Sequence, residues 1–600
     1  MSLASLPIRY PSRVYLSIAP VLALGALAPT PSFTPLVLLV AILRLHFDTI
    51  IPRRAWASAV FQIILVSLAT GLVNAAPSLH ALSTPTTSLF VLAFLSLLAT
   101  TVAAGTITAG YLIERAVNTP WTHATIFPAT WATAWALVER GSPVGQLATW
   151  SPVINLGGYS WLRQVGGQVA INWIVAAWAV IISDVVGQWM MGSAEETKSV
   201  STEDLLSDDL PVQRTISPAP LAISMGTRRT LLMMAFLFGL AAPSYIFTEL
   251  PPPVNAPDVT PFGVACAMPY RQKNGQPKGP PSLDDYVSES HTLQSQAKII
   301  LWPESAVHFT QAGEREGALE KIRPYINNGT YYGIGFEEVV HADSPDGVWK
   351  RGMRRNGLVL LGWEGVVYEY YKRNLVPIAE SFSMTTSNEK PSIFTMELHA
   401  PSGWTRPSWN PAGNHTRPID ITASICLDFT TASSFADLPS RPALILAPAR
   451  TWHSSIGLAM WEQAKARAEE TGSMVLWCDG GEGGVSGIAG RGLHAFRQVG
   501  PGSWAQTVSV PWPFDQRRTI FSAAGTTASL TVVWVVVAGM GWMAGKVVLV
   551  SQMGGREHRA GRFVAGLAGG MQGVVQFVRT IGHRERRGEE QSLLGHDTNA

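Results

Sequence analysis

Three side chains in this sequence carry complementary chemistry, and each stands where a strand-like run of residues ends. They are Glu304, Lys372 and Cys426. A cysteine must lose its proton before it attacks a carbonyl carbon, and a nearby carboxylate can accept that proton and return it to the leaving group. An ammonium beside the thiol lowers the pKa of the thiol and stabilises the oxyanion formed by the attack. We therefore expect the three to meet in one site for nucleophilic catalysis that needs no histidine.

A purely structural interpretation of the same residues stays open at this point. A lone cysteine is often a small buried apolar side chain, and a glutamate and a lysine can form an ordinary surface ion pair. The chain has three cysteines, Cys266, Cys426 and Cys478, which cannot build a disulfide framework and say little about the redox compartment. Spacing alone does not decide between packing and catalysis.

The elements that must position these residues form a layered α/β domain. Short apolar strands alternate with helices, which is typical of helices covering a mostly buried sheet. Reactive residues at strand ends suit such a domain, because rigid strands support the loops there. The predicted strands cover 262–268, 298–302, 330–337, 356–362, 365–372, 419–426, 443–447, 474–478 and 484–489, and the predicted helices cover 283–296, 314–323 and 458–471.

Composition indicates that this domain is joined to a membrane domain. The 600 residues are 47% hydrophobic and 14% charged, whereas a soluble domain has roughly 25% charged residues. The apolar residues concentrate in 14–248 and 526–550, and 249–523 reads as a soluble sequence. The net charge of +2 gives no basic field that would favour nucleic acid.

Eight apolar segments are candidate membrane spans. Several reach the roughly 20 residues that a bilayer helix needs, whereas the first, second and fifth are short. We reject a signal peptide at the first segment, because further apolar segments follow at once and no small-residue cleavage site stands out. The segments are 14–30, 35–45, 55–75, 88–113, 126–138, 168–191, 230–247 and 523–550.

Basic residues predict the orientation of these spans. With eight spans and a cytoplasmic N-terminus, most loop and tail arginines face the cytoplasm, and the opposite loops carry only Arg140 and Arg163. Both termini are then cytoplasmic, and the soluble domain lies in a lumen or periplasm. That domain holds two N-glycosylation sequons, at Asn328 and Asn414. Residues near 193–224 are expected to form a disordered cytoplasmic loop.

The contexts of the three reactive residues resemble the nitrilase (carbon–nitrogen hydrolase) superfamily, and within it the bacterial apolipoprotein N-acyltransferase family. The matching stretches are WPESA at 302–306, YKRNLVPIAE at 371–380 and ICLD at 425–428. The family has several membrane helices before its nitrilase-like domain and one after it, so the resemblance covers nearly the whole chain. It implies a multi-span membrane domain at 1–248, an α-β-β-α sandwich at 249–522, a membrane helix at 523–550 and a basic cytoplasmic tail at 551–600.

The resemblance also implies a role for each residue. Cys426 would be the nucleophile that becomes a thioester, Glu304 the general base and then acid, and Lys372 the oxyanion stabiliser. Glu380 matches a second acidic position of the lysine motif, and Asp428 stands where the family has glutamate. The donor would be a phospholipid and the acceptor a lipidated protein or another amine, both reached from the membrane. No cofactor or metal is implied.

The sequence departs from the family at three places. Leu427 replaces an aromatic residue directly after the nucleophile. ARTW at 449–452 replaces an Asn-Asp-x-Trp stretch, so only Trp452 matches, and DGGEGG at 479–484 replaces an Asn-rich strand. These changes concern the groups that shape the acyl and acceptor pockets, so the reaction class is better supported than the acceptor.

Three functions fit these observations. The first is a membrane N-acyltransferase that works through a thioester on Cys426. The second is a membrane-anchored carbon–nitrogen hydrolase (amidase) with the same trio and water as acceptor. The third is an inactive nitrilase-like domain used for binding, against which the intact trio argues. The multi-span N-terminal half favours acyl transfer, because a hydrolase of soluble amides needs one anchor at most.

Overall fold

The computed structural model describes most of the chain. The site and both large sheets belong to the first of two compact units, residues 1–537 and 538–600. The expected cytoplasmic loop near 193–224, the tail from 554 on and the sequon at Asn414 lie outside the described residues. The described residues are 9–117, 121–191, 225–246, 250–256, 258–269, 272–273, 276–277, 279–343, 349–400, 416–482, 484–490 and 495–553.

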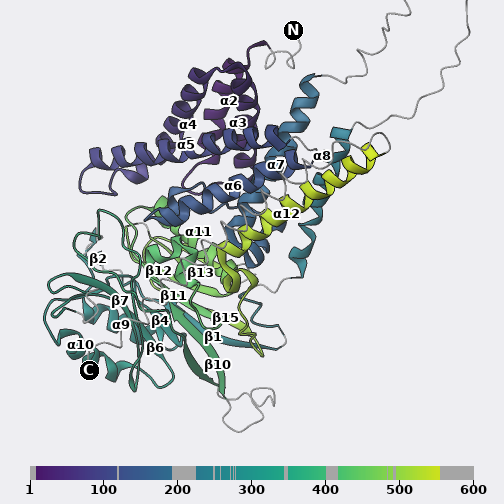
Figure 1. The fold of residues 1–600 in the computed structure, drawn as a ribbon. Helices are drawn as coiled ribbons and strands as arrows, with labels where there is room; N and C mark the ends of the chain where they lie inside the picture. Colours follow the sequence, from purple (N-terminus) through teal and green to yellow (C-terminus); the bar gives the residue numbers. More distant parts are fainter. Residues whose placement is uncertain are drawn as a thin grey trace, which may run out of the picture. The chain divides into compact units, whose positions relative to one another are not determined.

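Each of the eight predicted apolar segments overlaps a helix, but five helices in the described part of the chain are long and apolar enough to cross a membrane: α3, α4, α5, α7 and α12. The prediction of eight spans is therefore not confirmed. Pro29 and Pro31 follow the end of α2 and Gly239 ends α8, so both helices stay short. The helices, shown in Figure 1, are α2 (Pro11–Ala26), α3 (Phe33–Arg53), α4 (Trp56–Ser78), α5 (Pro85–Val117), α6 (Thr122–Gly141), α7 (Leu162–Met191), α8 (Met225–Gly239) and α12 (Ile520–Met553).

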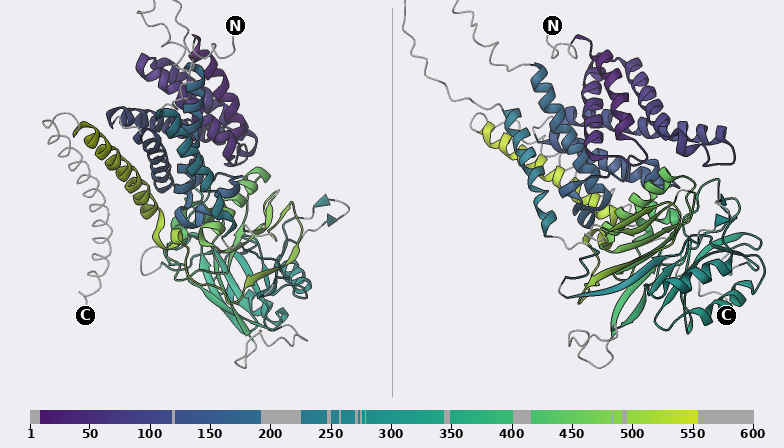
Figure 2. Two further views of the ribbon diagram at one scale, coloured as in Figure 1. Left: turned by 90° about the vertical axis from the view of Figure 1, so that its right-hand side faces the viewer. Right: turned by 180° about the vertical axis from the view of Figure 1, so that it is seen from behind.

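The N-terminal helices pack together into a bundle with a buried aromatic and aliphatic interior; both views in Figure 2 show them side by side. Large apolar side chains remain exposed on its outside, among them Phe61, Leu72 and Phe90. Exposed apolar faces of this extent are typical of helices that contact lipid. The bundle is thus suited to a membrane.

The strands form two large sheets. Their orders are β15-β1-β4-β6-β7-β8, with β5 paired to β6, and β14-β13-β12-β11-β10-β9. The first sheet contains β1 (Val259–Cys266), β4 (Ile299–Leu301), β5 (Val307–Phe309), β6 (Tyr331–Val339), β7 (Arg354–Gly362), β8 (Gly365–Tyr371) and β15 (Trp504–Pro511). The second contains β9 (Phe394–His399), β10 (Thr416–Ala423), β11 (Leu444–Ala449), β12 (Met474–Asp479), β13 (Val485–Ala489) and β14 (Phe496–Val499).

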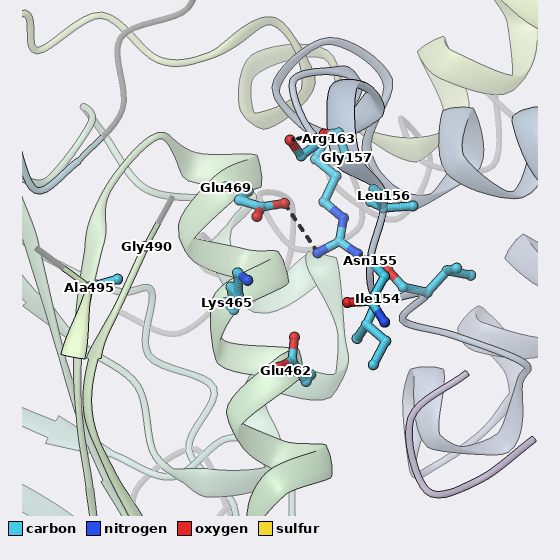
Figure 3. Close-up of a pocket in the computed structure, with 12 residues that line it drawn as sticks. Ile154, Asn155, Leu156, Gly157, Arg163, Glu462, Lys465, Glu469, Gly490 and Ala495 are labelled. Atoms are coloured by element: carbon cyan, nitrogen blue, oxygen red, sulfur yellow. Dashed lines mark hydrogen bonds and ion pairs between the residues drawn. The ribbon is translucent and has the colours of Figure 1, made fainter. Parts of the chain in front are cut away.

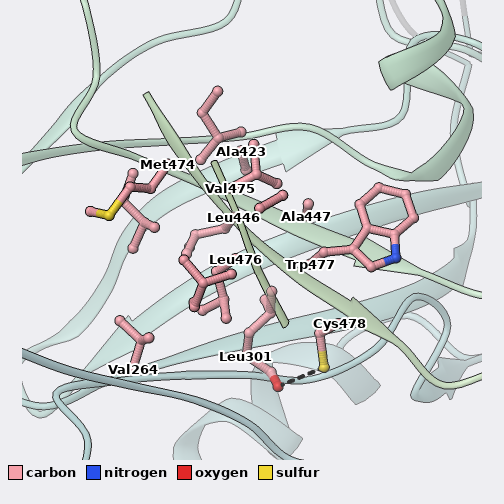
Figure 4. Close-up of a cluster of buried hydrophobic side chains, with 14 of the residues drawn as sticks. Val264, Leu301, Ala423, Leu446, Ala447, Met474, Val475, Leu476, Trp477 and Cys478 are labelled. Atoms are coloured by element: carbon pink, nitrogen blue, oxygen red, sulfur yellow. Dashed lines mark hydrogen bonds between the residues drawn. The ribbon is translucent and has the colours of Figure 1, made fainter. Parts of the chain in front are cut away.

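The two sheets pack face to face and helices cover their outer faces. The core between them includes Val264 and Leu301 from the first sheet and Leu446 and Leu476 from the second (Figure 4). Helices α9 (Leu283–Leu293) and α10 (Glu314–Ile322) bury the outer face of the first sheet, and α11 (Ser454–Thr471) packs on the second sheet. The expected α-β-β-α layers are therefore present.

Strand direction brings loops from both sheets to one edge. In the first sheet β1, β4 and β6 are parallel, and in the second β10, β11 and β12 are parallel. Antiparallel strands flank each parallel set. The carboxyl ends of parallel strands share one edge of a sheet, where α/β domains bind ligands.

One pair of cysteines departs from the sequence prediction. Cys266, at the end of β1, and Cys478, in β12, form a disulfide with their Cα atoms 5.5 Å apart. The bridge joins the two sheets through their shared core, because both side chains point into it. Of the three cysteines in the chain, only Cys426 is free.

The sandwich also contacts the helical bundle. Arg163 of α7 forms an ion pair with Glu469 of α11 at 3.3 Å, and both side chains are buried. The indole Nε1 of Trp452, just before α11, donates to the backbone carbonyl of Pro77 in α4 at 3.1 Å. These contacts hold the loop after β11 against the end of a membrane-type helix.

Candidate active site

Glu304 lies in the loop after β4, buried between the two sheets. Its Oε1 accepts hydrogen bonds from the Lys372 ammonium at 2.8 Å and from Nδ2 of Asn356 at 2.7 Å. The Cys426 thiol donates to the same carboxylate. The loop approaches β6 closely, because a Cβ at Gly335 would lie 2.1 Å from the carbonyl oxygen of Pro303. The structure thus brings all three predicted residues together.

Lys372 follows β8, and strand alternation explains where its side chain points. Tyr368 and Tyr370 face the core between the sheets, and Lys372 continues that alternation, so its side chain points toward the second sheet. Its Nζ lies 2.8 Å from Glu304 Oε1 and 2.8 and 2.9 Å from the two carboxylate oxygens of Glu380. The predicted second acidic residue therefore holds the ammonium from the opposite side.

Cys426 interrupts the alternation of β10. Ile425 still points into the core between the sheets, but Cys426 has a φ of 44°, in the left-handed region that non-glycine residues rarely adopt. A short 3₁₀ turn, Cys426–Thr430, follows. This sharp turn presents the thiol to Glu304. Strained backbone of this kind is found at reactive centres, where the surrounding structure holds it in place.

Asp428 holds the cysteine turn to the lysine loop. Its Oδ2 accepts from the hydroxyl of Tyr370 at 2.9 Å and from the N–H of Ile425 at 3.1 Å. Its Oδ1 accepts from Arg373 N at 3.2 Å and from Asn374 N and Nδ2 at 2.7 and 2.9 Å. Every donor to Asp428 lies beside the cysteine turn, at the end of β8 or in the loop that follows β8. The short side chain of an aspartate is therefore long enough to reach all of them. Asp428 is thus a positioning residue.

Burial affects the reacting groups in opposing ways. It raises the pKa of the Glu304 carboxyl, against the effect of the Lys372 ammonium. It also raises the pKa of the Cys426 thiol, and the Glu304 charge acts in the same direction. Burial disfavours the Lys372 ammonium, but the charges of Glu304 and Glu380 outweigh this and raise its pKa. Burial therefore favours the neutral form of the Cys426 thiol. The Lys372 ammonium lies 2.8 Å from the Glu304 carboxyl, and the raised pKa makes Glu304 a stronger base.

Sequence reasoning missed several residues of this site. Asn356, at the start of β7, donates to Glu304, and Tyr370 and Asn374 hold Asp428. Asn374 lies inside the stretch that carried the resemblance. Asn356 gave a weaker signal, since one polar residue at the start of a predicted strand has many explanations. Its partner lies 52 positions away in the chain, so only the fold reveals the pair.

A separate cavity lies away from these residues. It has a volume of about 370 Å³ and lies between the segment before α7 and α11; Figure 3 shows its polar lining by Arg163, Glu462, Lys465 and Glu469. None of Glu304, Lys372 or Cys426 lines it. The described residues of its lining include no cysteine, so the predicted thiol chemistry does not take place there.

Comparison with known proteins gives a likeness to solved structures only. No family model and no curated protein matches the chain. A mutant of the Nesterenkonia AN1 amidase from the nitrilase superfamily matches with 16% identity and a TM-score of 0.30, covering 45% of this chain and 94% of that chain. Saccharomyces cerevisiae Nit3, a member of branch 10 of the nitrilase superfamily, matches with 12% identity and a TM-score of 0.29, covering 42% and 90%. At these TM-scores, the layered architecture rests on the strand order and packing described above.

Proposed function

We propose that this protein is a membrane N-acyltransferase that moves an acyl chain from a phospholipid to an amine through a thioester on Cys426. One observation carries the proposal: the thiol donates to a Glu304 carboxylate that is itself bonded to a buried ammonium. A thiol, a base and a cation in contact form the minimum set for acyl transfer through sulfur.

The chemistry can be followed atom by atom. Glu304 takes the thiol proton as the sulfur attacks the ester carbonyl, and Lys372 stabilises the oxyanion. The bond from carbon to the glycerol oxygen breaks, and Glu304 returns the proton to that oxygen, releasing a lysophospholipid. The amine then attacks the thioester and gives a proton to Glu304. The carbon–sulfur bond breaks, and Cys426 regains its proton as the amide is released.

The position of the site favours a lipid donor. The backbone N–H of Arg450 acts as a hydrogen-bond donor that lowers the pKa of the Cys426 thiol, and two residues later Trp452 is bonded to Pro77 of α4. The reactive thiol is therefore connected by one short loop to the end of an apolar helix. A phospholipid ester lies at the level of the membrane interface, so this connection supports a phospholipid as the acyl donor.

Mass spectrometry of the intact protein tests the proposed reaction. Incubating the full chain in detergent with a diacyl phospholipid should add the mass of one acyl chain, and a diether phospholipid without the ester should add nothing. A primary amine should then remove the added mass as an amide. Release of ammonia from simple amides without an acyl adduct would instead establish the amidase alternative.

We further propose that residues 249–522 lie on the non-cytoplasmic side, with both termini in the cytoplasm. The distribution of arginines supports this orientation, and so does the Cys266–Cys478 disulfide, because disulfides persist in oxidising compartments.

Glycosylation tests that orientation. Asn328 is exposed and begins an N-G-T sequon. Expression in eukaryotic microsomes should therefore attach a glycan that endoglycosidase removes and Asn328→Gln abolishes. Protease added outside sealed microsomes should leave the domain intact; digestion of the domain would place it in the cytoplasm.

A further inference from the structure

The loop after β11 contributes a backbone donor to the site. β11 ends at Ala449 and lies parallel and next to β10, which leads into the turn at Cys426. The backbone N–H of the next residue, Arg450, acts as a hydrogen-bond donor that lowers the pKa of the Cys426 thiol. The side chain of Arg450 is exposed, so its main chain, not its charge, is the part directed at the sulfur. An N–H directed at sulfur stabilises the thiolate over the thiol. The same N–H can donate to the oxyanion that forms beside the sulfur.

A buried carboxylate holds this loop. Asp479, at the end of β12, accepts through Oδ1 from Thr451 N at 2.9 Å and from Gly481 N at 3.0 Å. Its Oδ2 accepts from Thr451 Oγ1 at 2.6 Å. Asp479 and Thr451 are both almost fully buried. Two oxygens of one carboxylate thus bind the N–H and the hydroxyl of the residue that follows Arg450.

Close packing fixes the same loop from two sides. A Cβ at Gly481 would lie 1.7 Å from the carbonyl oxygen of Thr451, so only glycine fits there. A Cβ at Gly457, in α11, would lie 3.1 Å from Thr451 Oγ1. The loop is therefore held between α11 and the turn after β12.

We propose that Asp479 and Thr451 are positioning residues that direct the Arg450 N–H at the reacting sulfur and its oxyanion, so that this N–H and Lys372 form a two-donor site. This inference rests on the proposed function for its catalytic meaning. It also explains two departures from the resembled family, at 449–452 and 479–484. They pair with each other, with the Asp479 carboxylate in the second stretch binding Thr451 in the first.

Alkylation of Cys426 tests the inference without any lipid. Cys426 is the one free thiol among three cysteines, so without reductant iodoacetamide reports on it alone. Thr451→Val removes the hydroxyl that binds Asp479. The midpoint of the alkylation rate against pH should rise by about one unit, with an about tenfold slower rate at a fixed pH below it. Thr451→Ser keeps the hydroxyl and should restore the wild-type profile.

A matched variant separates positioning from general loosening of the sheet. Thr395 Oγ1 donates to buried Asp420 at 2.7 Å in the same sheet, away from the reactive loop. Thr395→Val should therefore leave the alkylation profile unchanged. The charged groups that face the thiol, Glu304, Lys372 and Glu380, are the same in all of these variants, so they do not contribute to a difference between the profiles. If Thr451→Val does not fold, Asp479→Asn replaces one acceptor oxygen with a donor and should raise the midpoint in the same way.

The outcomes separate this inference from the proposed reaction. A folded Thr451→Val or Asp479→Asn protein with the wild-type profile would overturn the positioning role. A shifted profile restored by Thr451→Ser would establish it, even if phospholipid left no acyl adduct on the wild-type protein. In that case the proposed acyl transfer would fail while the donor geometry stood.

Discussion

Cys426→Ala is expected to abolish the acyl adduct completely. Alanine keeps the Cβ, so the left-handed backbone at this position, with its φ of 44°, is neither relieved nor made worse, and the fold should persist. Only the sulfur is lost. The other two sulfurs are joined in the Cys266–Cys478 bridge, so no second thiol can take over. Intact mass after incubation with phospholipid measures the result, and an adduct on the alanine variant would contradict the assignment.

Two further variants sharpen this result. Cys426→Ser should lower the rate of adduct formation by at least about 10³-fold, because a hydroxyl is far less acidic than a thiol and Glu304 is a weak base for it. The double variant Cys266→Ala/Cys478→Ala removes the bridge but keeps the nucleophile, and it should still form the adduct. If the adduct were lost in Cys266→Ala/Cys478→Ala as well as in Cys426→Ala, the loss would indicate a general failure of the fold.

The central strands could be predicted from the sequence because they are continuously apolar. The predicted strand at 443–447 overlaps β11 (Leu444–Ala449), and the predicted strands at 356–362 and 365–372 correspond to β7 and β8. Of the strands in the two large sheets, those missed are β5, β9, β14 and β15. Three of them are short or half exposed, with alternating polar residues. β15 pairs along its whole length with β1. The local sequence of β15 does not predict this pairing, because β1 lies more than 200 residues earlier in the chain.

The meeting of the three candidate residues could be predicted because their chemistry is complementary, whereas the residues that support them could not be predicted. Glu304, Lys372 and Cys426 stand together as expected. The disulfide was missed because two cysteines 212 positions apart can be paired only by a known fold. Asp479 looked like part of a degenerate glycine-rich stretch, and its partner Thr451 lies in a different departure from the family. The sequence alone does not reveal that Asp479 and Thr451 bind each other, because the fold brings them together.

Lys372 offers the clearest separation of catalysis from stability. Its ammonium is fully buried and bonds carboxylates on both sides, Glu304 at 2.8 Å and Glu380 at 2.8 Å. Lys372→Met fills much of the same volume without the charge. We expect adduct formation to slow by at least about 10²–10³-fold, the usual loss for one oxyanion donor. Breaking a buried ion pair should also lower the free energy of unfolding by about 3–5 kcal/mol.

The stability lost in Lys372→Met should depend on pH. Burial already raises the pKa of Glu304 above its ordinary value against the effect of the ammonium, and removing that cation raises it further. An acid whose pKa is higher in the folded protein contributes stability below its unfolded pKa, and this is lost as pH rises through the folded pKa. Thermal unfolding of the variant should therefore occur at progressively lower temperature as pH rises above about 4.5, and more steeply than in the wild type.

A second substitution decides between the two roles of the ammonium. In Lys372→Met/Glu380→Gln the like charge facing Glu304 is also removed, so much of the lost stability should return. Acyl transfer should not return, because no cation faces the oxyanion. Recovery of both stability and rate in the double variant would mean that Lys372 serves only to neutralise the two carboxylates. Recovery of stability without recovery of the rate would assign the Lys372 ammonium to the reaction. The double variant would then be as well folded as the wild type and would lack only the ammonium that donates to the oxyanion.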